Sequence, residues 1–329
     1  MASWYNTAAA SSFLLYEMME EMMMEKLGEL IKDWMVDYKA NSVKPSSYDR
    51  LISTHELMCR YDISQIGLEE LSVSMIQQYL NELVRDGYAL STIKKQFHLI
   101  SEYIDFANLN GIIPRPYHKG VKLPSESAVR KHRKEVIAYT KDEQKRLRSV
   151  LERGDSPIYF TALLMLETGM RIGEVLALTW SDIDWRRKCV RISKTLVKLG
   201  AGRKHSYVQN SAKSYSSNRV IPLSSEALRI LEHLKETDGY SEIIFHNRHG
   251  DHMSYEASRW WIKRACEEAG VPYYGQHVFR HTFATNCYDR GCDVKLLSKL
   301  LGHADVTITY NVYVHLFGDA LEEMRRVIG

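Results

Sequence analysis

Apolar residues recur at helical spacing over the first third of the chain, in runs that polar turns separate. Gly87 and Gly111 end two of these runs, and glycine is the residue that most often stops a helix. The last run opens with Ser91, and serine favours helix N-termini. We therefore predict an all-α domain over residues 25–112. Its four amphipathic helices are expected over residues 25–40, 46–61, 72–87 and 91–111.

A second domain over residues 136–316 has a different pattern. Thr140 and Glu143 in "YTKDEQ" have the spacing of a capping box, which predicts a helix start. Short runs of β-branched and aromatic residues then predict a small antiparallel sheet. The expected fold class is mainly α with a small antiparallel β-sheet, an all-α domain followed by a mixed α+β domain. The strands are expected over residues 189–197, 204–209 and 218–223, and helices near residues 141–152, 157–168, 172–178, 225–236, 255–269, 277–289, 293–301, 305–313 and 318–327.

Three further segments complete the organisation. The run 113–135 is basic and contains prolines and a glycine, so we expect an extended linker between the domains. Its charge fits either a solvated hinge or contact with an anionic partner. Residues 1–24 are expected to form a Met-rich helix or extension, and residues 317–329 a C-terminal helix with an apolar stripe.

Composition excludes several classes of protein. A chain of 329 residues with 45% hydrophobic content is typical of two globular domains. No run approaches the roughly 18–20 apolar residues of a membrane helix. Glutamates interrupt the first apolar segment, which lacks the basic start of a signal peptide. The five cysteines have no metal-ligand spacing, so we expect reduced thiols in a cytoplasm, without a metal or other cofactor. The net charge of +3 alone does not indicate nucleic-acid binding.

The stretch "QHVFRHTFAT" places two cation-capable side chains on one helix face. His277 and Arg280 are three residues apart, so their Cβ atoms are expected roughly 5–6 Å apart. Because two such groups repel each other unless an anion lies between them, this stretch predicts an anion site. Further candidates for the same site are Arg171, Lys213, His303, Tyr310 and Tyr313.

Each of these candidates also has an ordinary explanation. Arg171 precedes Glu174 by three residues, which fits a surface ion pair. Lys213 lies in a polar turn, where lysines are usually solvated. His303 follows Gly302 just past a predicted helix end, a common place for a capping or core histidine. A tyrosine on a helix usually serves packing.

Taken as a set, these residues favour chemistry on a phosphodiester. Arginine forks match phosphate oxygens, and preorganised cations stabilise the extra negative charge that a phosphodiester gains under attack. A tyrosine, with an ordinary pKa of about 10, becomes a nucleophile when nearby cations favour its phenolate. A lysine can protonate the departing oxygen. The set therefore predicts a covalent tyrosine intermediate formed without metal or ATP.

The order Arg…Lys…His-x-x-Arg…Gly-His…Tyr over residues 137–316 resembles the tyrosine recombinases, also called the phage integrase family, and in particular the integrases of phages and conjugative transposons. The matching segments are "TGMRIGE", "AKSYSSNRVIPL", "HVFRHTFAT", "LLGHADVTIT" and "YNVYVH". The resemblance implies that residues 25–112 form a core-binding domain and residues 136–316 a catalytic domain. It further implies that Arg171 and Arg280 bind the scissile phosphate, Lys213 is the general acid, His277 and His303 assist proton transfer and charge stabilisation, and Tyr313 attacks.

The chain departs from the family pattern in three places. Val278 and Phe279 stand where the family usually has Asp-Leu, which is tolerable because neither residue takes part in the chemistry. The family's nucleophile lies nine or ten residues after the Gly-His histidine; Tyr313 is ten after it and Tyr310 seven, so Tyr313 is favoured and Tyr310 is the alternative. Residues 1–24 are too short for the arm-binding domain of many integrases, so the chain is either of the two-domain kind or begins after such a domain.

The resemblance implies a site-specific DNA recombinase of a mobile element that acts through a 3′-phosphotyrosine and a Holliday junction. The implied partners are duplex DNA with specific sites, a homotetramer linked by exchanged C-terminal helices, and DNA-bending accessory proteins, all in the cytoplasm near the nucleoid. The alternatives are a catalytically inactive DNA-binding relative and a type IB topoisomerase-like DNA-relaxing enzyme. DNA contacts are expected from Lys94, Lys95, Arg130, Lys131, Arg133 and Lys134.

Overall fold

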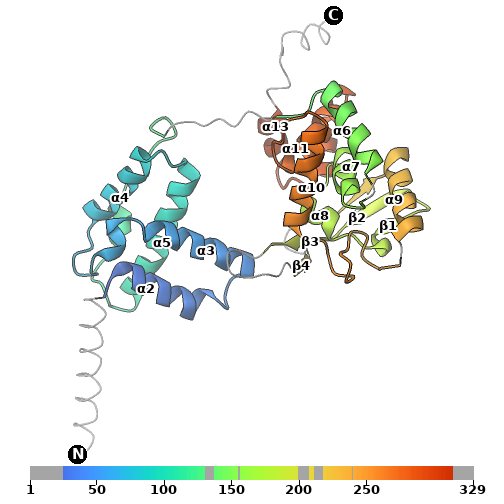
Figure 1. Ribbon diagram of the computed structural model, residues 1–329. Helices are drawn as coiled ribbons and strands as arrows, with labels where there is room; N and C mark the ends of the chain where they lie inside the picture. The colour runs from blue at the N-terminus through green and yellow to red at the C-terminus, as the bar shows by residue number, and fades with distance from the viewer. Residues whose placement is uncertain are drawn as a thin grey trace, which may run out of the picture. The chain divides into compact units, whose positions relative to one another are not determined.

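The computed structural model describes residues 25–129, 137–154, 156–198, 207–210, 218–238 and 240–313. The chain divides between residues 134 and 135 into two compact units, and each has its own hydrophobic core. Figure 1 colours the first unit blue to teal and the second green to red. The domain bounds predicted from the sequence stay predictions.

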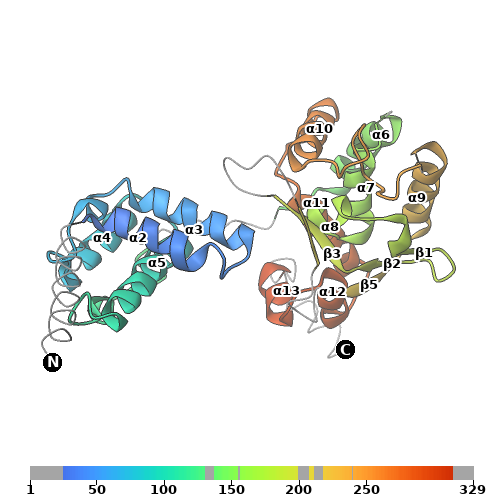
Figure 2. The same cartoon turned by 90° about the horizontal axis from the view of Figure 1, so that it is seen from below.

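The described part of the first unit is all α. Its longest helix, α5, packs against the other three helices, which wrap apolar faces around it (Figures 1 and 2). Leu80, Leu99 and Ile100 are fully buried at their meeting point. The helices are α2 (Leu27–Trp34), continued by a π-helical turn (Met35–Lys39), α3 (Pro45–Met58), α4 (Val73–Arg85) and α5 (Leu90–Leu109), with a 3-10 turn at Asp62–Gln65.

The first part of the expected linker packs onto this helical unit. Ile113 and Val129 are both buried in its core, and a 3-10 turn forms at Tyr117–Gly120. The side chain of Gln77 on α4 bonds both backbone groups of Lys122, at 2.8 and 3.0 Å. The structure therefore differs from the expectation of an extended linker over 113–129, because apolar residues anchor this segment.

The second unit surrounds one central helix. Helix α7 (Tyr159–Thr168) is buried along nearly its whole length and contacts α6, α8, α9, α10 and α11. Figures 1 and 2 show it within the helical half of the unit, with the strands to one side. The surrounding helices are α6 (Lys141–Arg153), α8 (Ile172–Leu176), α9 (Ser225–Asp238), α10 (Tyr255–Glu268), α11 (His277–Asp289), α12 (Val294–Leu301) and α13 (Val306–Tyr313).

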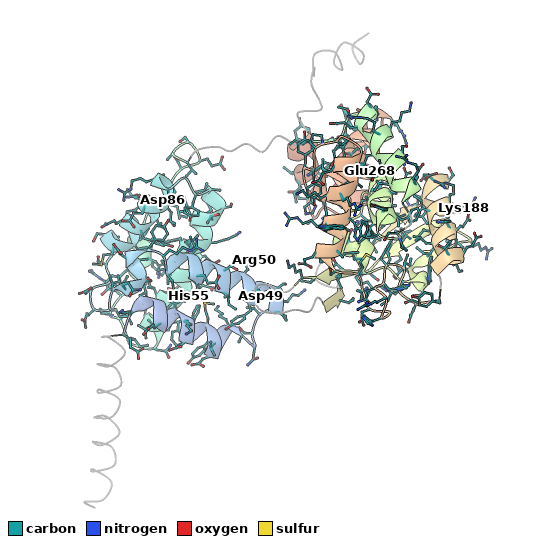
Figure 3. All side chains as sticks on the ribbon, in the orientation of Figure 1. Asp49, Arg50, His55, Asp86, Lys188 and Glu268 are labelled. Carbon is teal, nitrogen blue, oxygen red and sulfur yellow. The ribbon has the colours of Figure 1, made fainter. Side chains whose placement is uncertain are left out.

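The strands in the described part of the second unit form two small antiparallel sheets. One sheet has the order β1-β2-β5, and the other pairs β3 with β4. The single strand expected over 189–197 is interrupted at Ser193, because its two halves pair with different partners. Lys188 sits at the exposed turn between β1 and β2 (Figure 3). The strands are β1 (Ile183–Asp184), β2 (Cys189–Ile192), β3 (Lys194–Val197), β4 (Tyr207–Asn210) and β5 (Arg219–Pro222), and a 3-10 turn at Trp180–Asp182 precedes β1.

The predicted fold class is confirmed. The capping box of α6 forms, with the Thr140 hydroxyl accepting from the Glu143 backbone N–H and the Glu143 carboxylate bonding back. Gly87 and Gly111 follow helices with positive φ, as helix-ending residues. The expected helices over 1–24 and 317–329 lie outside the described residues.

Candidate active site

The end of α7 directs the chain into the candidate site. Gly169 caps this helix with φ 65°, a left-handed conformation that glycine adopts without strain. A Cβ atom added there would lie 2.3 Å from a ring carbon of Phe283, so this position also requires a residue without a side chain. Two residues later Arg171 forms the N-terminal boundary of α8. The turn therefore fixes where the Arg171 side chain starts.

The buried carboxylate of Glu174 accepts hydrogen bonds from two arginines of the site. It accepts from the backbone N–H of Arg171 at 2.8 Å and from the Arg171 guanidinium at 2.9 Å. It also takes two bonds from Arg219 on β5, at 2.7 and 3.0 Å. Burial raises the pKa of Glu174, but the bonds and charges of Arg219 and Arg171 outweigh burial and lower this pKa to about 2. The predicted Arg171–Glu174 pair therefore forms, but its carboxylate lies in the interior.

Arg280 is almost fully buried on α11, with 4% of its surface exposed. Its Nη1 donates to the Gly169 oxygen at 2.8 Å, and its Nη2 donates to the Leu301 oxygen at 2.6 Å. Nη2 also lies 2.8 Å from Nε2 of His303. The guanidinium therefore links the turn after α7 to the end of α12.

The backbone oxygens of Leu300, Leu301 and Gly302, which we call the α12 carbonyl end, each accept from a different arginine. Arg219 Nε donates to the first at 2.7 Å and Arg280 Nη2 to the second. Arg171 Nη2 lies 3.5 Å from the third. A helix C-terminus has carbonyls without helical partners and the negative end of the macrodipole. It can therefore hold three positive side chains close together.

The site histidines lie in a positive environment. Burial and the charges of Arg280, Arg171, Arg219 and His281 lower the pKa of His303 to about 4. Reduced hydration, Arg280 and Arg171 also lower the pKa of His277, although its side chain is exposed. His303 directly follows the left-handed cap Gly302, which turns it back towards Arg280. Lowered histidine pKa values are the expected effect of cations gathered without a full set of counter-charges.

Helix α13 begins three residues after His303. Its Thr309 is fully buried, and its hydroxyl lies 2.7 Å from Nδ1 of His303. Tyr310 is half exposed on this helix. The backbone of Tyr313 is described one turn beyond Thr309, whereas its side chain is not described. The nucleophile prediction therefore rests on helix position alone.

Arg171, His277, Arg280 and His303 are thus gathered in one region. Lys213 lies outside the described residues, between β4 and β5, and so do Arg130, Lys131, Arg133 and Lys134. Lys94 and Lys95 are exposed on α5 of the first unit. That Lys94 and Lys95 contact DNA stays a prediction.

Sequence reasoning missed Arg219 and Thr309. On β5, Arg219 and Ile221 are buried and Val220 between them is exposed, so Arg219 lies on the inward face of the strand. A charged residue at an inward strand position was the signal that the sequence offered. No comparable pattern marks Thr309, because one threonine on a helix is common.

The described residues contain no group of His, Cys, Asp and Glu side chains suited to a metal ion. Among the same residues, no helix has the length and apolar content to cross a membrane. What the site offers is a set of fixed guanidinium donors with neutral imidazoles beside them. Such a set can bind a phosphate and stabilise added negative charge on its oxygens.

Comparison with known proteins gives consistent matches. Residues 138–319 match the family described as the phage integrase family. A tyrosine recombinase XerC-like protein of Caldanaerobacter subterraneus subsp. tengcongensis is 28% identical over 319 residues, which cover 88% of this chain and 79% of the relative. The transposase from transposon Tn916 of Enterococcus faecalis is 30% identical over 286 residues, 79% of this chain and 67% of the relative.

Two solved structures share the fold. The Tn1549 transposon integrase in complex with a circular intermediate DNA matches with a TM-score of 0.73 at 19% identity, covering 92% of this chain and 99% of that one. A lambda integrase tetramer bound to a Holliday junction matches with a TM-score of 0.63 at 18% identity, covering 88% and 77%.

Proposed function

The chain belongs to the phage integrase family of tyrosine recombinases, and we propose that its α12 carbonyl end organises the arginines that hold a scissile DNA phosphate while Tyr313 attacks it. The protein is a site-specific DNA recombinase. The observation that carries the proposed chemistry is the convergence of Arg171, Arg219 and Arg280 on three successive backbone oxygens.

The three arginines have different roles in this proposal. Arg219 is committed to Glu174 by two hydrogen bonds, so it neutralises that carboxylate and leaves Arg171 able to turn to the phosphate. Arg171 is the more exposed partner, with 38% of its side chain accessible. Arg280 supplies a second fork, which two backbone oxygens already hold in place. Donors held in place before the substrate arrives need little reorganisation in the transition state.

The reaction proceeds by transfer of the phosphodiester between oxygens. The Tyr313 hydroxyl gives its proton to a neutral site histidine as its oxygen bonds to phosphorus, the bond to the 5′ oxygen breaks, and the Lys213 ammonium gives that oxygen a proton. The products are a 3′-phosphotyrosine and a free 5′-hydroxyl. A 5′-hydroxyl from a second duplex reverses the step, and two rounds of exchange pass through a Holliday junction. His277 and His303 take part in proton transfer and charge stabilisation.

We further propose that the protein acts on the recombination sites of a mobile element. A transposon transposase and a XerC-like recombinase are both among its relatives, and the 30% identity to the former supports the mobile-element assignment. A homotetramer joined by exchange of residues 317–329, DNA-bending accessory proteins and a location near the nucleoid belong to the same proposal. Lys94, Lys95 and the cluster 130–134 are proposed to meet DNA phosphates, which makes binding steeply salt-dependent.

Trapping of the covalent intermediate tests this proposal. DNA fragments bound by the purified protein are sequenced first, and a nicked suicide substrate is then built on the recovered site. Wild-type protein is expected to form a covalent DNA adduct that Tyr313→Phe does not form and Tyr310→Phe still forms. No adduct on any recovered site would indicate an inactive DNA-binding relative. Relaxation of supercoiled DNA without site preference would indicate the topoisomerase-like alternative.

A further inference from the structure

Two cysteines meet at the turn that joins α11 to α12. Helix α11 ends in a Schellman motif, in which the Cys292 backbone N–H donates to the Cys287 oxygen at 3.0 Å. The Gly291 N–H donates to the Tyr288 oxygen at 2.7 Å, and Gly291 has the left-handed backbone of this motif, with φ 81°. In a Schellman motif, the third residue from the helix end packs against the second residue beyond the cap. Here both of these residues are cysteines.

Cys292 also precedes the next helix. It is followed by Asp293, whose carboxylate accepts from two backbone N–H groups in the first turn of α12. A residue in this position often packs on the fourth helical residue, which here is Leu297. The two cysteines pack in one cluster with the buried side chains of Ala284, Leu297 and Leu301. Two different helix-end motifs therefore direct the thiols to the same small apolar site.

This cluster borders the support of Arg280. Arg280, Ala284 and Cys287 have helical spacing on α11, so they share one face of that helix. The Leu301 side chain is fully buried in the cluster, and its backbone oxygen accepts from Arg280 Nη2 at 2.6 Å. A change in how the two cysteines pack is therefore transmitted to Arg280 through Leu301.

We propose that Cys287 and Cys292 are a dithiol site that a low-molecular-weight disulfide oxidises to an intrachain disulfide, and that this bond slows DNA cleavage. The effect on cleavage rests on the proposed function, whereas formation of the bond does not. The backbone hydrogen bond between the two residues keeps their Cα atoms within about 7 Å, and disulfides span about 4.4–6.8 Å. Asp289, Arg290 and Gly291 are exposed, so a small reagent can reach the turn.

Oxidation proceeds by two thiol–disulfide exchanges. The Cys292 thiolate attacks one sulfur of the reagent, which forms a mixed disulfide and releases one reagent thiolate. The Cys287 thiolate then attacks the Cys292 sulfur, which forms the protein disulfide and releases the second reagent thiolate. The protein gives up two protons and two electrons, and the reagent is reduced to two thiols. Because the second step is intramolecular, proximity favours it over a lasting mixed disulfide.

Both thiols are protonated near neutral pH. Burial, with the neighbouring Cys292 and Glu167, raises the pKa of Cys287 to about 11 against the opposing charge of Arg290. Burial and Asp293 raise the pKa of Cys292. Since the thiolate is the reactive form, oxidation is slow at neutral pH and becomes faster as pH rises. The test is therefore run in mildly alkaline buffer.

The new bond changes the packing of the cluster. A disulfide places its sulfur atoms about 2.0 Å apart, much closer than two thiols in contact. Phe283, Leu297 and Leu301 must then repack around it, which displaces the α12 carbonyl end relative to Arg280. Cleavage slows because the donors were preorganised in the reduced protein.

Trypsin separates the two cysteines, which makes the bond directly observable. Its cleavage sites give peptides 281–290 and 291–295, each with one cysteine. The full-length protein is treated with oxidised glutathione, its remaining thiols are alkylated, and the digest is analysed by mass spectrometry. We expect these peptides to be joined in the wild type and in Cys189→Ser, a control that removes another partly buried cysteine of the same unit. Cys292→Ser is expected to give no joined pair.

Suicide-substrate cleavage measures the effect on the site. We expect the oxidised wild type to cleave at least about threefold more slowly than the reduced protein and to recover fully in dithiothreitol. Oxidised glutathione is expected to leave the cleavage rate of Cys292→Ser unchanged, because this variant cannot form the bond.

The two readouts separate the possible failures. A wild-type digest without the joined peptides, or with glutathione retained on either cysteine, overturns the inference. Joined peptides with an unchanged cleavage rate overturn the proposed effect on Arg280. If the reduced wild type forms no covalent DNA adduct, the proposed function fails, while the peptide map still decides whether the disulfide forms.

Discussion

Replacing Glu174 by glutamine removes a buried negative charge to which both Arg219 and Arg171 bond. The carboxyl has a folded pKa of about 2 against an ordinary value of 4.5. This difference corresponds to about 3 kcal/mol of folding free energy. Because the folded pKa is depressed, the contribution is complete above the unfolded pKa and is lost as pH falls from about 5 towards 2.

Wild type loses somewhat less than half of this contribution by pH 3.5 and most of it by pH 2. Glu174→Gln carries no titrating group at this position, so its stability lacks that part of the pH dependence. At pH 7 the variant is expected to be less stable by about 3 kcal/mol, because two arginines are left facing a neutral amide.

Urea unfolding at a series of pH values between 7 and 3.5 measures this difference. Tryptophan fluorescence reports mainly on the second unit, since Trp180, Trp185, Trp260 and Trp261 all lie there. Glu268→Gln is the control, because it removes the same charge from an exposed position at the end of α10 (Figure 3). The stability gap between wild type and Glu174→Gln should narrow as pH falls. A gap that stays constant over this range would refute the buried-carboxylate reasoning.

Three further predictions concern the same region. Arg280→Ala is expected to lower suicide-substrate cleavage by at least about a thousandfold, since it removes a preorganised fork from the phosphate site; near-wild-type cleavage would contradict the site. Gly169→Ala is expected to cost about 1–2 kcal/mol from its left-handed backbone alone, with more from the contact with Phe283, as measured by urea unfolding. Arg219→Met is expected to slow cleavage at saturating DNA more than it weakens binding, because it leaves Glu174 free to compete for Arg171; a pure loss of DNA affinity would contradict a positioning role.

Local signals predicted most of the helices because each carries its own information. The helix expected over 277–289 forms over that range, and the Thr140–Glu143 capping box starts α6 as expected. The strand expected over 189–197 was only half right, since the break at Ser193 depends on which distant strands pair with each half. Pairing of that kind is a tertiary property and leaves no local pattern.

Local patterns in the sequence nominate residues of the candidate site, but they do not reveal the groups that support those residues. The spacing of His277 and Arg280 on one helix face is a local pattern, and it indicates an anion site from the sequence alone. The α12 carbonyl end could not be predicted, because its role depends on three arginines that arrive from separate elements. The place of Thr309 in the site could not be predicted either, because it depends on a contact with the side chain of His303 and not on the residue being a threonine.

Mapping the protein–DNA bond tests the proposed chemistry most directly. The adduct from a suicide substrate is digested with trypsin and nuclease, and the peptide that carries the nucleotide is sequenced by mass spectrometry. We predict a single 3′-phosphate ester on the oxygen of Tyr313. An ester on Tyr310, on a serine, or on no residue of this chain in protein that still recombines DNA would contradict the proposal.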